Sequence, residues 1–180
     1  VVYAKKDKVK NLLIYDAINK ILNKNKILAP KLLNQNYKKN YIEVEDFGDN
    51  TLYKVLKHTK TNKELIFIKI LKTLRRLQLI KDKQVVNLNN QKYKVLQYDN
   101  KILSNEAKLF SEWYASRNIN KFTIRNFKKK YENEVKKLIS KLVLKNNTFV
   151  HRDFHVSNLM YVKNNIAVID SQDALIGNKA

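Results

Sequence analysis

The chain has 180 residues, with 37 lysines and arginines against 16 aspartates and glutamates and a formal net charge of +21. It contains no cysteine, which excludes a disulfide framework and a thiolate metal site. No apolar run approaches the ~20 residues that a membrane-spanning helix needs, and no signal-peptide pattern opens the chain. We therefore expect a soluble, cytoplasmic protein without a membrane partner.

The positive charge suggests nucleic-acid binding, but its distribution argues against this function. Lysine is scattered nearly end to end together with abundant asparagine and isoleucine, as expected of an AT-rich genome. Only Lys128–Lys130 forms a tight run, and it lies on the outer face of an amphipathic helix. We expect weak, nonspecific binding to polyanions at low salt and no specific nucleic-acid partner.

The first part of the chain predicts a strand, a helix and two further strands. Residues 1–4 are strand-like, and apolar residues recur at helical spacing over Val9–Leu22. Ala29-Pro30 breaks this pattern. The stretches Lys31–Gln35 and Tyr41–Glu45 then predict two strands joined by a polar turn.

Two helices and an ambiguous segment are predicted next. Asp49 or Asn50 caps a short helix that reaches about His58, and Thr61 caps a longer one. The longer helix is amphipathic, and its predicted buried stripe comprises Leu65, Ile68, Leu71, Leu74 and Leu77. Residues 81–98 are polar and predict a loop or a small β excursion.

Helical spacing returns over Asn100–Arg117 and again over Ile124–Lys145. The apolar residues at helical spacing in the first of these helices are Leu103, Ala107, Phe110 and Tyr114. The inner stripe of the second comprises Phe127, Tyr131, Val135, Leu138 and Leu142. Aromatic residues at such positions usually belong to a core.

The most informative residues lie near the C-terminal end of the chain. Asp153, the last residue of a His-Arg-Asp tripeptide, is followed at +5 by Asn158, and Asp170 ends an apolar strand. The stretches Leu159–Val162 and Ile166–Ile169 predict a hairpin, which would bring Asn158 and Asp170 side by side. This is the arrangement that phosphoryl-transfer enzymes use.

Each of these three residue types suits one part of that chemistry. Asp153 can accept a hydrogen bond from a substrate hydroxyl and take its proton as the bond to phosphorus forms. Asn158 and Asp170 offer one neutral and one charged hard oxygen, a pair suited to Mg²⁺.

Zinc is the chemical alternative. His151 and His155 are spaced i, i+4 with Asp153 between them, but the metalloprotease pattern needs Glu at the second position, where Arg152 stands. An arginine beside a dication is unfavourable, so phosphoryl transfer is the favoured interpretation.

The chain resembles the aminoglycoside phosphotransferase and choline kinase family, small-molecule kinases with a protein-kinase-like fold. Within it the chain is most similar to the branch of anomeric kinases that phosphorylate N-acetylmuramate and N-acetylglucosamine in bacterial cell-wall recycling. Four stretches carry the resemblance: His151–Met160, Ile169–Leu175, Val44–Asp49 and Leu109–Tyr114.

The resemblance implies an α+β, two-lobed fold of which this chain is a fragment. Residues 1–47 would form a partial β N-lobe and residues 48–180 a partial, mostly helical C-lobe, without the first N-lobe strands or the last C-lobe helices. ATP and Mg²⁺ would be the cofactors. Asp153 would be the catalytic base, Asn158 and Asp170 the metal ligands, and the backbone of Glu45, Asp46 and Phe47 the hinge that meets adenine.

The chain also departs from the family pattern. Most relatives have Gly where Arg152 stands, and protein kinases have Gly at the position of Gln172. No Gly-rich phosphate loop is visible, and the ATP lysine has no firm counterpart, although Lys5 and Lys6 lie in the right region. Further candidates for substrate binding or support of the site are Arg152, His155, Gln172, Asp173, Glu106 and Trp113.

We expect an ATP- and Mg²⁺-dependent kinase that acts on a hydroxyl of a small molecule, most simply an amino sugar. The alternatives within the enzyme class are an aminoglycoside kinase, which needs an acidic pocket, and a choline-type kinase, which needs an aromatic cage. A noncatalytic nucleotide- or polyanion-binding protein is the alternative of another class, motivated by the charge and the missing phosphate loop. The oligomeric state stays open.

Overall fold

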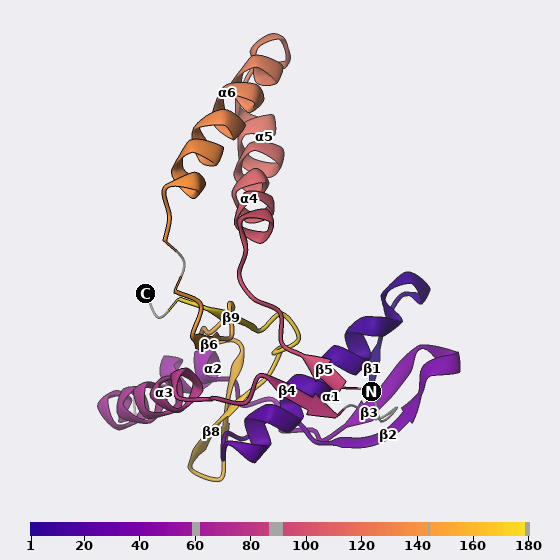
Figure 1. Ribbon diagram of the computed structural model, residues 1–180. Helices are drawn as coiled ribbons and strands as arrows, with labels where there is room; N and C mark the ends of the chain where they lie inside the picture. Colours follow the sequence, from indigo (N-terminus) through magenta and orange to yellow (C-terminus); the bar gives the residue numbers. More distant parts are fainter. Residues whose placement is uncertain (59–61, 87–91, 144, 179–180) are drawn as a thin grey trace. The chain divides into compact units, whose positions relative to one another are not determined.

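The computed structural model describes residues 1–58, 62–86, 92–143 and 145–178. These residues form a mixed α+β fold whose contacts divide it into two compact units (Figure 1). The first unit joins Val1–Leu96 to the segment that starts at Asn147, and the second covers residues 97–146. This division does not test the predicted lobe boundary between residues 47 and 48, which stays a prediction.

An antiparallel sheet of strand order β1-β3-β2 opens the first unit. A bulge between Leu32 and Asn34 interrupts the pairing of β2 with β3. The predicted order of strand, helix, strand and strand is confirmed. The elements are β1 (Val2–Tyr3), η1 (Lys6–Lys8), α1 (Val9–Lys24), β2 (Leu32–Asn36), η2 (Tyr37–Lys39) and β3 (Tyr41–Val44).

Helix α1 packs one face into the main core, where Ile18, Ile21 and Leu22 are fully buried. Beyond its end, the side-chain amide of Asn23 donates to the Ala29 carbonyl at 2.9 Å. The side chain therefore satisfies a backbone group that the helix cannot reach, which fixes the turn into β2.

The predicted C-terminal hairpin is confirmed by β7 (Leu159–Val162) and β8 (Asn165–Val168), which pair antiparallel with Leu159 opposite Val168. Its turn residues Lys163 and Asn164 take φ angles of 44° and 67°, as tight two-residue hairpin turns require. The hairpin is held at both edges: Val168 N donates to Leu28 O at 2.8 Å, and Tyr161 N donates to Asn50 O at 2.9 Å.

Two further strand pairs complete the first unit. β6 (Thr148–Val150) pairs with β9 (Leu175–Gly177), and β4 (Gln84–Val86) pairs with β5 (Lys92–Lys94), both antiparallel. The β4–β5 pair is the small β excursion that was one of the two predictions for residues 81–98. Its neighbour Val95 is buried in the main core.

The helix caps differ from the predicted ones. Helix α2 (Leu52–Lys57) begins after Thr51, whose hydroxyl accepts from Lys54 N at 3.3 Å, so the prediction of Asp49 or Asn50 as the cap was wrong. Helix α3 (Lys63–Gln78) is capped by Asn62, which accepts from Leu65 N at 3.0 Å. Thr61, the predicted cap, lies outside the described residues.

The prediction of the buried face of α3 was right for Leu77 and wrong for Leu65, Ile68 and Leu71. Ile66, Thr73 and Leu77 are buried, whereas the predicted members Leu65, Ile68 and Leu71 are 47%, 41% and 63% exposed. Apolar residues occur on more than one side of this helix, so periodicity alone could not select the inner side. The face that packs is the one beside Lys69, which donates to the Asn164 carbonyl of the hairpin turn at 2.8 Å.

The second unit is helical and comprises α4 (Asn100–Leu109), η3 (Phe110–Ala115), α5 (Ser116–Asn118) and α6 (Lys121–Ser140). Figure 1 shows α4 and α6 side by side. The helical pattern predicted over Asn100–Arg117 is confirmed, and η3 is a π-helical stretch within it. The wider turn places Ser111 and Ala115 in buried positions and leaves Phe110 and Tyr114 45% and 62% exposed, against the predicted core.

Helix α6 ends at Ser140, short of the predicted Lys145. Phe127, Tyr131 and Val135 lie on its partly buried side as predicted, but Ile139 continues that side in place of Leu138, which is 65% exposed. Leu142 lies beyond the helix and is 53% exposed. Across the described parts of the chain, no helix has both the length and the apolar character to cross a membrane.

The burial of α3 predicts the effect of two matched leucine truncations. Leu77→Ala should lower the free energy of unfolding by about 2–5 kcal/mol, because Leu77 is 1% exposed in the main core. Leu71→Ala should change it by less than about 0.5 kcal/mol. Urea denaturation of both variants measures the difference. Equal losses would show that the assigned face of α3 is wrong.

Candidate active site

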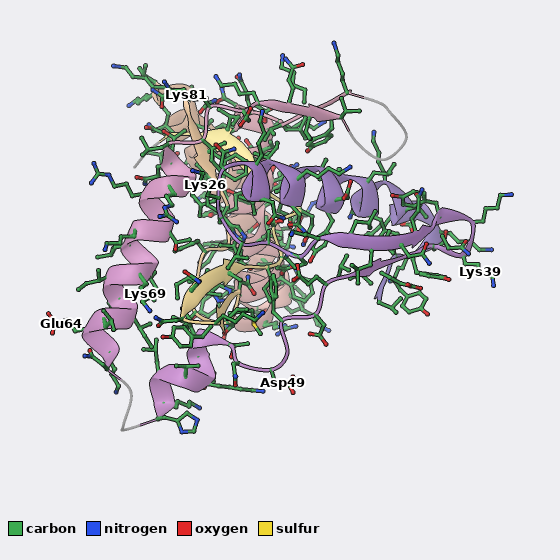
Figure 2. All side chains as sticks on the ribbon, turned by 90° about the horizontal axis from the view of Figure 1, so that it is seen from below. Lys26, Lys39, Asp49, Glu64, Lys69 and Lys81 are labelled. Carbon is green, nitrogen blue, oxygen red and sulfur yellow. The ribbon has the colours of Figure 1, made fainter. Side chains whose placement is uncertain are left out.

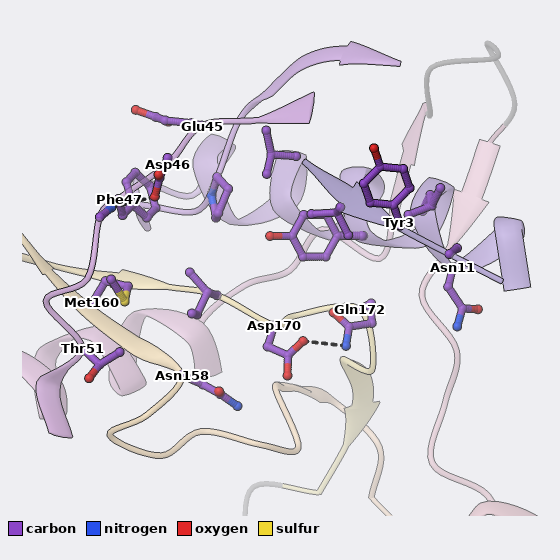
Figure 3. A pocket seen from close by; sticks show the side chains of 18 of the residues that line it. Tyr3, Asn11, Glu45, Asp46, Phe47, Thr51, Asn158, Met160, Asp170 and Gln172 are labelled. Carbon is purple, nitrogen blue, oxygen red and sulfur yellow. Dashed lines mark hydrogen bonds between the residues drawn. The ribbon is translucent and has the colours of Figure 1, made fainter. Parts of the chain in front are cut away.

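A cavity of about 740 Å³ opens in the first unit between the N-terminal sheet, α1 and the base of the β7–β8 hairpin. Figure 3 shows Glu45, Asp46 and Phe47 on one side of this cavity and Asn158 and Asp170 on another. The predicted hinge and the predicted metal ligands, which lie more than one hundred positions apart in sequence, therefore share one cavity.

The hinge segment has a defined local conformation. Glu45 N donates to Lys31 O at 2.8 Å, which continues the β2–β3 pairing, and Gly48 N donates to the Asp46 carboxylate at 2.8 Å. Gly48 has φ +73°, a left-handed conformation that glycine adopts without steric cost.

Asp153 and Asn158 contact each other directly. The Asn158 side-chain amide donates to Asp153 Oδ2 at 2.9 Å and to the Asp153 carbonyl at 3.1 Å. His155 Nε2 lies 3.1 Å from the other carboxylate oxygen, Asp153 Oδ1. Asp153 is not itself a lining residue of the cavity but is joined to it through Asn158. Its carboxylate stays accessible, because the side chain is 57% exposed.

Asp170 lies beside Asn158, as the hairpin predicted. Ile169 N donates to Asn158 O at 3.1 Å, so the residue before Asp170 pairs with Asn158 at the open end of the hairpin. Asp170 takes φ +58°, and its Oδ1 accepts from Gln172 Nε2 at 2.8 Å (Figure 3). The structure thus brings Asp153, Asn158 and Asp170 together.

The side-chain oxygens of Asn158 and Asp170 suit a hard divalent cation as ligands. Asn158 uses its amide nitrogen on Asp153, which leaves its oxygen Oδ1 for another partner, and Gln172 engages only Oδ1 of Asp170. Within the described ranges, no group of three or more His, Cys, Asp and Glu side chains gathers as a metal site. Such a pair suits Mg²⁺, which binds few protein ligands and completes its octahedron with water and phosphate oxygens.

His151 is a buried histidine that bonds to the residue before Asp170. It is 3% exposed, and its Nε2 donates to the Ile169 carbonyl at 3.1 Å. Burial lowers the pKa of His151 below its usual 6.5, partly offset by the bond to Ile169 and by the charges of Asp153 and Asp170. Residues 151–155 are not helical, so His151 and His155 do not share a helix face, and the zinc alternative loses its geometric basis.

The remaining candidates near these loops are placed as follows. Arg152 takes φ +73° and donates through its guanidinium to the Asp173 carbonyl at 3.4 Å. Gln172 lines the cavity and holds Asp170, whereas His155 faces Asp153. The roles of these four residues stay predictions.

Glu106 and Trp113 belong to the second unit. The Glu106 carboxylate accepts from the Tyr98 hydroxyl at 2.6 and 2.8 Å. Trp113 is 61% exposed, with the Arg117 guanidinium 5.5 Å from its ring centroid. Their predicted place beside a sugar pocket stays a prediction.

Sequence reasoning missed several residues that line the cavity. Tyr3, Asn11 and Tyr15 come from β1 and α1, and Met160 comes from β7. Tyr15 lies between the buried residues Leu12 and Asp16 of α1, so the helical pattern could have indicated it once the cavity was known. Of the two candidates for the ATP lysine, Lys5 lines the cavity and Lys6 is not among its lining residues; Lys8 and Lys54 add two further cations.

The comparison with protein families identifies the class of this chain. The family model of the phosphotransferase enzyme family, APH, matches residues 3–179. The chain therefore belongs to the phosphotransferase enzyme family.

Two curated proteins that are similar to part of this chain are kinases of the same name. The chain is 32% identical over 81 residues to an N-acetylmuramate/N-acetylglucosamine kinase of Neisseria meningitidis serogroup B, covering 45% of this chain and 24% of the relative. It is 27% identical over 149 residues to the enzyme of the same name in Pseudomonas aeruginosa, covering 83% of this chain and 41% of the relative. The chain thus spans less than half the length of these relatives.

Solved structures match the fold at low sequence identity. The structure of APH(2'')-IIa in complex with gentamicin is 17% identical, with a TM-score of 0.62, covering 97% of this chain and 58% of that one. ADP-bound aminoglycoside phosphotransferase APH(2'')-Ib is also 17% identical, with a TM-score of 0.61, and the match covers 97% of this chain and 59% of that one. These matches support the fold, a mixed α+β arrangement shared with part of the aminoglycoside phosphotransferase chains.

The burial of His151 predicts an acid-sensitive stability. The pKa of His151 is lowered in the folded chain, so the unfolded chain binds the proton more readily. The contribution of neutral His151 to the free energy of unfolding is therefore complete above about pH 6.5 and is lost as the pH falls below this value. Protonated Nδ1 would be a buried donor for which the described residues provide no acceptor. His151→Gln should flatten the dependence of unfolding free energy on pH between 7.5 and 5.5.

The matched control is His58→Gln, because His58 is exposed at the end of α2. Urea denaturation at pH 7.5, 6.5 and 5.5 should give the wild-type slope for this variant. A wild-type slope for His151→Gln as well would refute the role assigned to His151.

Proposed function

We propose that the protein transfers the γ-phosphate of ATP to a hydroxyl of a small molecule, with an amino sugar of the N-acetylmuramate or N-acetylglucosamine type as acceptor. The observation that carries this proposal is the direct contact of Asp153 with Asn158, beside Asp170, at one end of a hairpin that faces a cavity. Residues 1–47 then form part of the N-lobe and residues 48–180 part of the C-lobe of a protein-kinase-like fold.

Asp153 is the proposed catalytic base. Its carboxylate is oriented by Asn158 and His155, which contact different oxygens at 2.9 and 3.1 Å. A carboxylate held from two sides and still accessible can accept the proton of an attacking hydroxyl.

Asn158 and Asp170 are the proposed Mg²⁺ ligands, and ATP is proposed to occupy the cavity. The bound cation would neutralise charge on the phosphates during transfer. The hinge backbone of Glu45–Phe47 would meet the adenine, and the cavity-lining Lys5, Lys8 and Lys54 supply cations near a triphosphate. The family assignment supports ATP as the phosphoryl donor.

The distribution of charge supports a small-molecule substrate over a polyanion. In Figure 2, labelled lysines come from several elements of the first unit: Lys39 lies in η2 and Lys81 after α3, whereas Lys26 and Lys69 line one small cavity. A specific nucleic-acid interface would concentrate such cations along one face.

Asp153→Asn tests the proposed base. In the full-length protein we expect turnover to fall by about 10²- to 10⁴-fold with nucleotide affinity nearly unchanged, because the amide keeps the shape of the side chain but cannot take the proton. ADP release measures turnover, and calorimetry measures nucleotide binding. Glu64→Gln, which removes an exposed negative charge in the first turn of α3, serves as the control and should keep wild-type turnover. Wild-type turnover in Asp153→Asn would refute the proposal.

A substrate panel tests the proposed acceptor. N-acetylmuramate or N-acetylglucosamine should stimulate ADP release above the rate without acceptor, and kanamycin and choline should not. Stimulation by kanamycin alone would indicate an aminoglycoside kinase instead. ATP binding without phosphoryl transfer to any acceptor would favour a noncatalytic nucleotide-binding protein.

A further inference from the structure

A buried hydrogen bond joins α1 to the loop between β8 and β9, which comprises residues 169–174 and is named the Asp170 loop. Ser171 Oγ donates to Asn19 Oδ1 at 2.6 Å, between residues 152 positions apart in the sequence. Ser171 is 0% exposed and Asn19 is 2% exposed. Removing either partner would leave the other as a buried polar group without its bond, an arrangement that folded proteins avoid.

Asn19 is itself held in place. Its side-chain amide nitrogen donates to the Pro30 carbonyl at 3.0 Å, which turns its oxygen toward Ser171. The Asn19 carbonyl accepts from the Asn23 side chain at 3.0 Å. One asparagine thus links three segments of the first unit: α1, the entry to β2 and the Asp170 loop.

The Asp170 loop needs such a restraint. Asp170 takes φ +58°, a conformation that residues with a side chain rarely adopt. Ser171 follows it directly, so anchoring Ser171 limits the rotation of the Asp170 backbone. Within the loop, Ala174 N donates to Ser171 O at 3.1 Å, and Gln172 holds the Asp170 carboxylate.

Tyr15 places the same part of α1 against the cavity. It lies one turn before Asn19 and lines the cavity together with Asp170. Burial raises the pKa of Tyr15; hydrogen bonding to Asn19 opposes this shift, and the charge of Asp170 adds to it. Asn19 therefore lies one turn from a residue of the cavity wall and bonds to the loop that carries the proposed metal ligand.

We propose that Asn19 is a positioning residue that holds the Asp170 loop in the conformation that binds Mg²⁺. This inference rests on the proposed function for its catalytic consequence, but not for the coupling between α1 and the loop. Asn19 touches no reacting group; it acts through Ser171 on the direction of the Asp170 carboxylate. Groups that orient a metal ligand in this way commonly change metal affinity by about 10- to 100-fold when removed.

Asn19→Ala and Ser171→Ala test the inference in the full-length enzyme. Each should raise the Mg²⁺ concentration for half-maximal activity by about 10- to 100-fold, while the KM for the acceptor at saturating Mg²⁺ stays within about twofold of wild type. The double variant should lose no more than the worse single variant, because the two changes break one bond.

Asn23→Ala is the matched control. Asn23 is an asparagine on the same helix whose side chain also holds a carbonyl of the entry to β2, but no hydrogen bond among the described residues joins it to the Asp170 loop. It should lower stability without changing the Mg²⁺ dependence. An equal Mg²⁺ shift in Asn23→Ala and Asn19→Ala, or additive effects of Asn19→Ala and Ser171→Ala, would overturn the positioning role.

Amide hydrogen exchange without metal or nucleotide separates this inference from the proposed function. Asn19→Ala and Ser171→Ala should each speed exchange at Ala174, whose amide bonds to Ser171 O, and Asn23→Ala should not. If wild type transferred no phosphate, the proposed function would fail while this measurement still tested the coupling. Unchanged exchange in both test variants would overturn the inference whatever the enzyme's activity.

Discussion

The antiparallel pairing of β7 with β8 is the constraint on which the candidate site depends. It places Leu159 opposite Val168, and the bond from Ile169 N to Asn158 O extends the pairing to the residues that flank the strands. Because Asn158 is paired with Ile169, a slip of one residue in this pairing would move Asp170 along the hairpin relative to Asn158. The buried strand residues fix this register and thereby the spacing of the two ligands.

Unfavourable backbone conformations gather around this pairing. Arg152 and Asp170 both take positive φ angles, and each lies in a loop next to the cavity or to Asp153. Such conformations persist only where neighbouring contacts hold them. The Arg152 guanidinium bonds to the Asp173 carbonyl, and Gln172 bonds to Asp170. The strain is therefore local and is offset by hydrogen bonds within the same loops.

The local part of this site could be predicted from the sequence. Asp153 and Asn158 are five positions apart, and a short turn separates two apolar stretches before Asp170, so their proximity needs only a hairpin. The helix α1 and the β2–β3 pair follow from patterns of similar length. The family assignment adds independent support, because the match extends over residues 3–179 and not only over the motif.

Features set by long-range packing could not be predicted in this way. Helix α3 carries apolar residues on several sides, and only contact with the hairpin turn through Lys69 distinguishes the face that contains Ile66 from the face that contains Leu71. The bond between Asn19 and Ser171 could not be predicted from either segment. A polar residue on an apolar helix face does not indicate which distant side chain it will bond to. Its meaning appears only when the fold brings it to Ser171, which shows why supporting residues of an active site are harder to predict than its ligands.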